Sequence, residues 1–389
     1  MGYNRKGNIL LLTFILLTAL GIIVGSLTYV VTVAIRKTGA DVEYLKCLYY
    51  AEAGMNKALW NLKTPPYLGG SGNSWRTPGL TEDFGEGTYK IIVESGAVPT
   101  QVKITAQGSL RNSTRTIQTY YYTYPPAFNY VLYSTGNTNV LTTARLTGDL
   151  YIDNNINIEA GAAVVGTVTV TPGHSVTGGG DYVLGSVPVP PPSYPTLVTT
   201  YYAARIAAAQ SENPLSKTYS GNLILNGGTV YVNGDVSIRG TIVGPGEIVS
   251  TGNITVLQNG VVSENVKLIA ANTLLLENNS AVGHDSVLYA GNQVTIQQNV
   301  YNEPIISILC PKNIAVYNNA YLTGIMYGGN IYFDNQSVYL GSIMAGNFGA
   351  QNLMRNGVRF FYYATKLPAV PPPGISFAYQ LVPGTWKEL

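Results

Sequence analysis

The pattern of apolar and polar residues changes character along the chain, and its first feature is a long uncharged run. Residues 8–35 carry no charged side chain, and basic pairs flank the run at Arg5-Lys6 and Arg36-Lys37. At 1.5 Å per residue, a helix over this run is about 42 Å long, which exceeds the roughly 30 Å hydrocarbon core of a bilayer. The run is also longer than the apolar part of a cleavable secretory signal. The pattern therefore predicts a retained, single membrane-spanning helix.

Beyond this run the pattern becomes amphipathic. Apolar residues recur at steps of three and four between Val42 and Leu59, with charged residues between them. One long helix is therefore predicted over residues 8–62, of which residues 8–35 form the membrane-spanning part. In the following segment, residues 63–126, three alternating runs predict a small antiparallel sheet that packs on the amphipathic half of the helix. These runs are Thr88 to Glu94, Val102 to Gln107 and Thr114 to Tyr122.

From residue 222 onward the chain repeats at a near-constant spacing. Polar anchor residues recur 17 to 21 positions apart at Asp235, Asn253, Asn272, Asn292, Asn313, Asn330 and Asn347. The residue four before each anchor is apolar and the residue two before it is mostly small, which predicts stacked strands that point the same columns inward. Amide ladders are expected at the corners, from Asn278-Asn279, Asn299, Asn318-Asn319 and Asn335.

This repeat predicts a parallel β-solenoid, which we take to be right-handed. Its main section is residues 220–361, and residues 127–185 form a first section, because Ser134-Thr135-Gly136-Asn137 matches Ser250-Thr251-Gly252-Asn253. A proline-rich excursion with a short helix, residues 186–219, separates the two, and residues 362–389 form a C-terminal tail. The predicted fold class is mainly β with one long N-terminal α-helix, a small antiparallel sheet and a parallel β-solenoid.

The column three residues before each anchor is predicted to face outward and is largely apolar. It contains Val232, Ser250, Ile269, Tyr289, Cys310, Tyr327 and Met344. Two interpretations stand side by side: the excursion or the tail covers this column, or Tyr289, Tyr327 and Met344 form an interaction face for a partner or a surface. Cys47 and Cys310 fall on different parts of the fold, so both are expected to be free thiols.

Composition and charge argue against several classes of function. Charged residues make up 11% of the chain, where about 25% is usual, and a net charge of +2 gives no electrostatic footprint for nucleic acid. The outward column lacks an ionisable cluster, the aspartates do not recur in one register, and His174 and His284 stand alone. We therefore predict no enzyme activity, no catalytic or metal-binding residues, no cofactor and no nucleic-acid partner.

The N-terminal residues resemble a known family. Arg5-Lys6-Gly7, the apolar run and the motif Tyr50-Ala51-Glu52-Ala53-Gly54 are similar to the N-terminal region of PilX-type minor pilins of type IV pilus systems. The resemblance implies that a prepilin peptidase cleaves between Gly7 and Asn8 and removes a leader of residues 1–7. It also implies a helix that crosses the cytoplasmic membrane once before assembly and then packs against other pilin subunits in a filament at the cell surface. The pattern of the repeats is similar to that of bactofilin-like polymerising proteins.

Four positions refine what the resemblance implies. Major pilins begin with Phe and carry a Glu at the fifth mature position, whereas this chain has Asn8 and Leu12 there. Lack of this Glu is shared by PilX-type and tip-forming subunits, and a carboxylate in hydrocarbon is costly unless it is paired. A subunit with Leu12 therefore suits the top of a filament. Gly21 and Gly25 form a G-x-x-x-G pair that is suited to close helix packing.

The leading hypothesis is a minor pilin that initiates or tips a filament and displays its solenoid for adhesion to a surface or a glycan ligand. One alternative is a permanently membrane-anchored surface protein that acts on or binds polysaccharide. A second alternative is a structural subunit that polymerises end to end through its uncapped coils.

Overall fold

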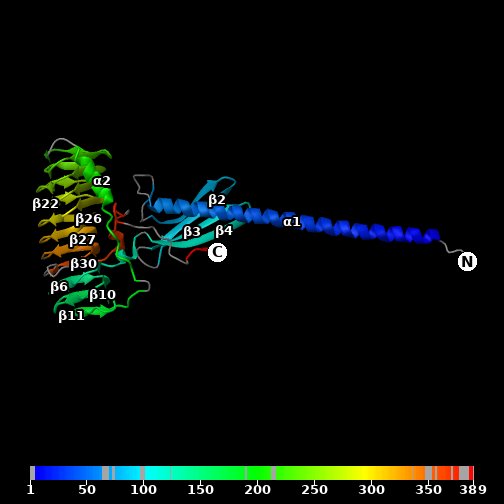
Figure 1. The fold of residues 1–389 in the computed structure, drawn as a ribbon, viewed down its shortest axis with the longest axis horizontal. Coiled ribbons are helices and arrows are strands. Elements are labelled where there is room, and N and C mark those ends of the chain that lie inside the picture. The colour runs from blue at the N-terminus through cyan, green and yellow to red at the C-terminus, as the bar shows by residue number, and fades with distance from the viewer. Residues whose placement is uncertain are drawn as a thin grey trace.

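The computed structural model describes residues 5–388 except 64–69, 72–74, 97–100, 123, 189–190, 212–215, 335, 347–352, 355–356, 369–370 and 376–384, and Asn335 and Asn347 lie outside the described residues. Figure 1 shows a long helix, a small sheet along its C-terminal half, and a column of stacked coils beyond the sheet. The predicted fold class is confirmed, because the chain is mainly β with one long N-terminal helix, an antiparallel sheet and a parallel β-solenoid.

Helix α1 runs from Arg5 to Lys63, which at 59 residues makes a rod of about 88 Å. Every described side chain from residue 11 to residue 42 is exposed. Contact with the rest of the chain is concentrated in the C-terminal part of the helix, where Cys47, Ala51, Ala58 and Leu62 are fully buried. The helix is thus a single element with two environments, an uncovered apolar half and a half that packs on the sheet.

The antiparallel sheet has the strand order β1-β2-β3-β4-β31. Its strands are β1 (Thr77–Phe84), β2 (Gly87–Ser95), β3 (Gln101–Leu110), β4 (Ser113–Tyr122) and β31 (Lys387–Glu388). The three predicted runs fall in β2, β3 and β4, whereas β1 and β31 were not predicted. Because β31 comes from the C-terminus, the whole solenoid is an insertion between two neighbouring strands of this sheet.

The solenoid has three parallel ladders of short strands. One ladder contains β15 (Thr229–Val232), β18 (Gly246–Ser250), β21 (Val266–Ala270), β24 (Ser286–Ala290), β26 (Tyr301–Val316), β27 (Tyr321–Phe333), β28 (Val338–Ala345), β5 (Leu132–Ser134), β8 (Leu150–Ile152) and β10 (Ala163–Val170). A second contains β13 (Lys217–Tyr219), β16 (Val236–Ile238), β19 (Ile254–Val256), β22 (Thr273–Leu276), β25 (Gln293–Ile296), β26, β27, β29 (Leu353–Met354), β6 (Thr138–Val140), β9 (Ile156–Ile158) and β11 (Val176–Thr177). The third begins with β14 (Leu223–Ile224), β17 (Thr241–Val243), β20 (Val261–Val262) and β23 (Ala281–Val282), and its later coils use β26 to β28, β30 (Arg359–Phe361), β7 (Arg145–Thr147), β10 and β12 (Asp181–Leu184).

The order of the coils in space differs from their order in the chain. Pairing of Ile343 with Leu132, and of Arg359 with Arg145, places the first solenoid section directly after the last coil of the main section. The chain therefore enters the column partway along, builds one end of it, crosses over the outside, and then builds the rest from the far end back to the point of entry (Figure 1). One continuous, mostly aliphatic core runs through both sections.

The predicted columns need correction by one residue in several coils. Ile254 pairs with Leu274, so the coil after Asn253 places Thr273, and not Asn272, at the anchor position. A shift of one residue moves a strand side chain to the opposite face. Consequently the outward column consists of Tyr231, Val249, Ile269, Tyr289, Leu309, Tyr327 and Met344. The outward placement of Val232, Ser250 and Cys310 was wrong, because they belong to the next column, which faces the core.

One corner of the solenoid repeats an unusual backbone conformation. Asn259, Asn279, Asn299, Asn319 and Gln336 all have φ between 58° and 63°, in the left-handed region where Asn and Gly cost least. Within the described residues, no side-chain hydrogen bond joins successive asparagines at this corner. Amide contacts stack instead at the anchors, where Asn330 Nδ2 donates to Asn313 Oδ1 at 2.9 Å. The corner asparagines are thus explained by backbone geometry and not by the predicted amide ladder.

The outward column is covered by segments from outside the repeat. These are the 3-10 turn η2 (Pro126–Asn129), helix α2 (Thr200–Ala209) in the excursion, and the tail with its 3-10 turn η3 (Ala364–Lys366). Together with the column they form a second hydrophobic core, rich in tyrosine, on the flank of the solenoid. A short bridge between Leu197 and Ile375 joins the excursion to the tail.

Candidate assembly helix and solenoid surfaces

The exposed half of α1 is a continuous apolar surface. Large apolar side chains between Leu11 and Ile35 are 45% to 73% exposed. The helix is long and apolar enough to cross a membrane, and its apolar window is not buried by any other part of the described chain. Leucine, isoleucine and valine exposed on all sides are stable in hydrocarbon or against other helices, but not in water. This half of the helix therefore requires a membrane or a helical partner.

The N-terminal residues singled out from the sequence lie along this exposed half. Apart from the helix's own backbone, no atom of the described residues lies within 4 Å of the position that a Cβ at Gly21 or Gly25 would occupy, so no described neighbour explains either glycine. Gly7 and Asn8 fall in the first turns of α1, where the side chains lie outside the described residues. Leu12 is 62% exposed.

The motif Tyr50 to Gly54 forms the seam between α1 and the sheet. Ala51 is fully buried, and a Cβ at Gly54 would lie 3.1 Å from the ring of Tyr89. On the opposite side of the seam, a Cβ at Gly108 would lie 2.0 Å from the carbonyl oxygen of Cys47. Small residues on both surfaces thus bring helix and strand backbones close together. Of the remaining motif residues, Glu52 is exposed and Ala53 is half-buried against the core between helix and sheet. The ring of Tyr50 lies beside Phe84 of the sheet, with the centroids 6.0 Å apart.

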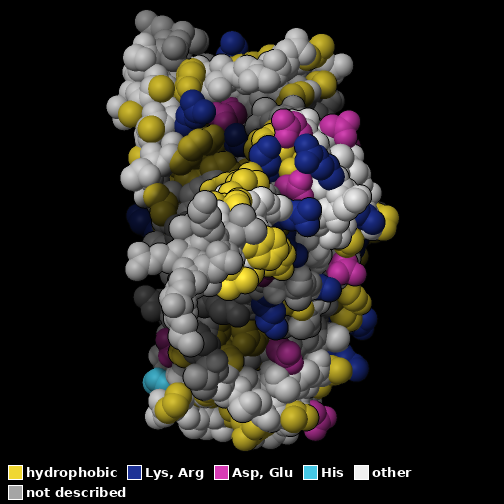
Figure 2. Space-filling model, turned by 90° about the vertical axis from the view of Figure 1, so that its right-hand side faces the viewer, with side chains coloured by type: hydrophobic (Ala, Val, Ile, Leu, Met, Phe, Trp, Pro, Cys, Tyr) yellow, Lys and Arg dark blue, Asp and Glu magenta, His cyan; other side chains and the backbone are white. Residues whose placement is uncertain are grey.

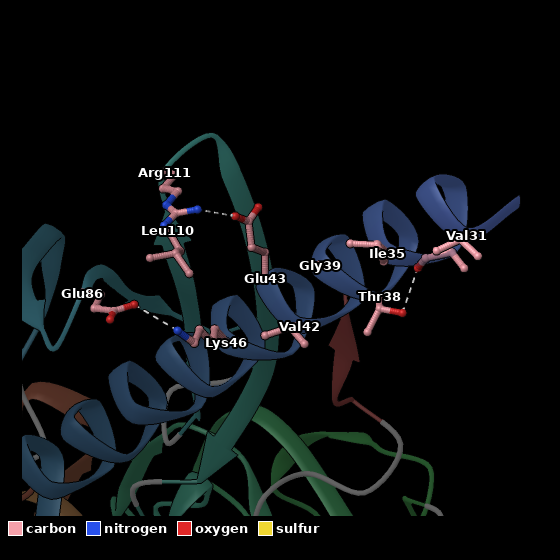
Figure 3. A pocket seen from close by; sticks show the side chains of 11 residues that line it. Val31, Ile35, Thr38, Gly39, Val42, Glu43, Lys46, Glu86, Leu110 and Arg111 are labelled. Carbon is pink, nitrogen blue, oxygen red and sulfur yellow. Dashed lines mark hydrogen bonds and ion pairs between the residues drawn. The ribbon is translucent and has the colours of Figure 1, made fainter. Parts of the chain in front are cut away.

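A hollow of about 570 Å³ lies where α1 leaves the sheet. Figure 3 shows two ion pairs beside it, Glu43 with Arg111 at 3.0 Å and Lys46 with Glu86 at 2.9 Å. The hydrogen bond from Lys46, with its charge, lowers the pKa of the Glu86 carboxyl. These surface pairs join the helix to the β1–β2 turn, through Glu86, and to the β3–β4 turn, through Arg111.

The residues predicted as an interaction face are not accessible. Tyr289 and Tyr327 are 4% and 9% exposed, and Met344 is fully buried. The ring of Tyr202, from α2, stacks on Tyr289 with the centroids 3.7 Å apart and the planes 5° apart. Covering by the excursion and the tail, which was the first of the two interpretations, is thus what the structure shows.

A charged cluster holds α2 to the solenoid beside this stack. The carboxylate of Glu247 accepts hydrogen bonds from Lys267 Nζ at 2.7 Å and Tyr201 OH at 2.8 Å, and it pairs with Arg205 at 3.1 Å. Burial alone would raise the pKa of Glu247, but the bonds from Lys267 and Tyr201 outweigh it and the net shift is downward. Burial likewise opposes the charge of Lys267, and contact with Glu247 raises its pKa overall. The cluster acts as a clamp between α2 and the solenoid, and the carboxylate of Glu247 is engaged in it.

The described residues contain no group of three or more His, Cys, Asp or Glu that could hold a metal ion. His284 accepts a bond from the backbone N–H of Ile305 at 3.3 Å, which gives it a structural role at a coil junction. Cys47 and Cys310 are free and buried, as expected. Viewed from the side of the N-terminus, Figure 2 shows charged side chains of both signs intermixed around a central apolar region, with no large face of a single charge.

Comparisons with known proteins give little further information. No protein-family model matches the chain, and no curated protein matches it. Among solved structures, the chain is similar to the crystal structure of the competence-associated pilin ComZ from Thermus thermophilus. That similarity has 11% sequence identity and a TM-score of 0.27, and it covers 89% of this chain and 97% of that chain. A TM-score of this size does not establish a shared fold.

Proposed function

We propose that this protein is a non-enzymatic filament subunit, a minor pilin of a type IV pilus or a related system. One observation carries the proposal. A single rigid helix exposes apolar side chains on all sides over its first half and is fastened to a sheet over its second half. Such a helix can rest in the cytoplasmic membrane with the sheet and solenoid outside, and can later exchange lipid for neighbouring helices without refolding.

The finer parts of the proposal follow from particular residues. A prepilin peptidase cleaves after Gly7, and Asn8 becomes the first residue of the mature chain. Leu12 offers no carboxylate to a neighbour's terminal amine, which suits a subunit that initiates or tips the filament. Gly21 and Gly25, which no other described element contacts, face other pilin subunits. The solenoid is then displayed at the cell surface or the filament tip, where it serves adhesion.

The processing step is tested by the mass of the chain isolated from membranes and from sheared filaments. We expect wild-type protein in filaments to begin at Asn8. Gly7→Val should block cleavage and keep the chain in the membrane, whereas the matched leader substitution Gly2→Val should leave both unchanged. Filament-bound chains that begin at Met1, or the absence of the chain from filaments, would overturn the assignment.

The position in the filament is tested separately by labelling an exposed solenoid residue, such as Tyr301, after substitution with cysteine in a Cys47→Ala, Cys310→Ala background. Label at filament ends supports initiation or tipping. Label at regular intervals along the shaft would refute the tip position and leave the filament assignment intact.

A further inference from the structure

One face of the solenoid brings two distant arginines together. Along the third ladder, pairing aligns Val338 with Arg359, Arg359 with Arg145, and Arg145 with Ala163. Arg359 belongs to the last coil of the main section and Arg145 to the coil on which the chain enters the column. The pair is thus created at the junction between the two sections, and no repeat within either section would place them together.

The arginine pair sets two like charges on adjacent strands. The backbones of such strands lie about 4.8 Å apart, and like charges at directly neighbouring positions are unfavourable. Both side chains are exposed, and neither forms an ion pair within the described part of the chain. A carboxylate near this corner, Glu159, is engaged by the backbone N–H and hydroxyl of Thr142 at 3.1 and 3.0 Å. A second carboxylate, that of Asp181 in the same ladder, lies two coils beyond Arg145.

Both arginines line a groove of about 630 Å³. Its other walls are small or apolar and include Ala163, Val165 and Phe361. Val165 is 47% exposed although it is aliphatic. The groove thus combines two guanidinium groups, one coil apart, with a surface against which a flat, weakly polar chain can lie.

The backbone at the rim of this groove departs from the repeat. In the neighbouring coils, where the corner residue before the third ladder has a left-handed φ, that residue is Asn, Gln or Gly. In the coil of Arg145 the same corner is Thr143, whose φ is 68°. A β-branched residue is strained in this conformation. Its Oγ1 accepts a hydrogen bond from the N–H of Gly357, in the adjacent coil, at 2.8 Å. Strained residues of this kind concentrate at ligand-binding positions.

From these observations we infer that the groove formed by Arg145, Arg359 and Phe361 binds an anionic polysaccharide that carries carboxylate groups. Each guanidinium matches a carboxylate through two parallel N–H bonds. The two arginines stand on adjacent coils, so one extended polyuronate chain lying across the groove can offer a carboxylate to each of them. The C–H faces of the sugars pack on Phe361 and Val165.

The surroundings favour a glycan over nucleic acid. With 22 Lys and Arg against 20 Asp and Glu, the chain has little excess positive charge, whereas a phosphate backbone is bound by an extended basic surface. The inference rests on the proposed function because it names the class of ligand that the adhesive solenoid binds. Glycan binding by the isolated protein does not require filament assembly, so a failure to bind glycan would not contradict the filament role, and a failure to assemble would not contradict the glycan site.

The test uses the full-length chain in detergent and measures binding to polygalacturonate, to neutral dextran and to double-stranded DNA. We expect polygalacturonate to bind, with an affinity that falls as salt is raised, and dextran and DNA to bind far more weakly. Loss of two charge-assisted contacts in the double variant Arg145→Gln, Arg359→Gln should weaken polygalacturonate binding by about a hundredfold. The matched control, Arg239→Gln, replaces an exposed arginine on a distant coil and should bind like wild type.

The variants remain informative because removal of a repulsive pair should not lower the melting temperature. Loss of binding in the double variant with an unchanged melting temperature supports the site. The inference is overturned if the double variant binds polygalacturonate as wild type does, if Arg239→Gln weakens binding equally, or if dextran or DNA binds as tightly as polygalacturonate.

Discussion

The contact between α2 and the solenoid allows a prediction with a worked magnitude. Tyr202 is fully buried, its ring stacks on Tyr289, and its hydroxyl donates to the carbonyl oxygen of Pro373 in the tail. Tyr202→Phe removes one hydrogen bond and should cost about 1 kcal/mol. Tyr202→Ala removes the ring as well, and truncation of a buried aromatic residue costs about 3–5 kcal/mol.

These substitutions should destabilise the cover, by which we mean α2 and the tail over the outward column, and not the coils. The coils are held by their own ladders and by the aliphatic core, to which Tyr202 does not belong. Hydrogen exchange measured on separate peptides distinguishes opening of the cover from opening of the coils. A local cost of about 4 kcal/mol corresponds to a roughly 10³-fold rise in exchange of α2 amides, and about 1 kcal/mol to a rise of about fivefold. Exchange in β21 and β24 should stay within a few-fold of wild type in both variants.

Ala204→Ser, on the exposed side of α2, is the matched control and should change exchange very little, because its propensity cost is about 0.5 kcal/mol. The reasoning is refuted if Tyr202→Ala leaves exchange in α2 unchanged, since the helix would then be held without the stack. It is refuted equally if α2, β21 and β24 all become unprotected together, since the cover and the coils would then form one cooperative unit.

Three further predictions concern other parts of the molecule. Because the folded-state pKa of Glu247 is lowered, its clamp stabilises α2 fully above the unfolded pKa and is lost as pH falls through the folded pKa. Protection of α2 against hydrogen exchange should therefore drop as pH falls below the ordinary range of a glutamate pKa, and Glu247→Gln should reduce protection at pH 7 and remove this pH dependence. Gly108→Ala should lower the melting temperature of the sheet by several degrees, because its Cβ would lie 2.0 Å from the Cys47 carbonyl oxygen. Gly39→Ala, with no atoms within 4 Å, is its control, and equal melting temperatures would contradict the close helix–sheet seam. Thr143→Asn should raise stability by about 1 kcal/mol in thermal unfolding, because Asn tolerates a left-handed corner and Thr does not; a loss of stability would show that the hydroxyl bond to Gly357 outweighs the strain.

The elements with strong periodicity could be predicted from the sequence, and their register could not. Residues 8–62 and the runs in β2, β3 and β4 have patterns that only one element type satisfies. In the main section of the solenoid, coil lengths vary between 17 and 21 residues. Asn272 and Asn292 stand one position from the anchors that pairing assigns. A polar residue is tolerated at either position, so residue type alone did not reveal this slip. It also did not reveal the shift of register between Cys310 and Asn313, after which the outward residue stands three and not four positions before the anchor.

The candidate glycan groove lay beyond prediction for a different reason. Arg145 and Arg359 meet only because the first solenoid section stacks after the last coil of the main section. A repeat indicates that neighbouring coils stack, but it carries no signal for how two blocks separated by an excursion join. β1, which contains Pro78 and Gly79, and the two-residue β31 were missed because neither has the alternation that marks a strand.

The way in which the solenoid is connected bears on how a filament subunit could carry load. The chain leaves the sheet after β4 and returns to it as β31, and Glu388 of β31 accepts a bond from Tyr44 of α1 at 2.7 Å. Both connections therefore reach the same edge of the sheet, beside the helix. The incoming strand β5 stacks between β28 and β8, inside the column and not at its end. A pull between a ligand on the solenoid and the helix in a filament thus acts on a coil that has neighbours on both sides, so no terminal coil can be peeled away first. The arginine pair lies on coils at this same junction, where a bound glycan would transmit force most directly to α1.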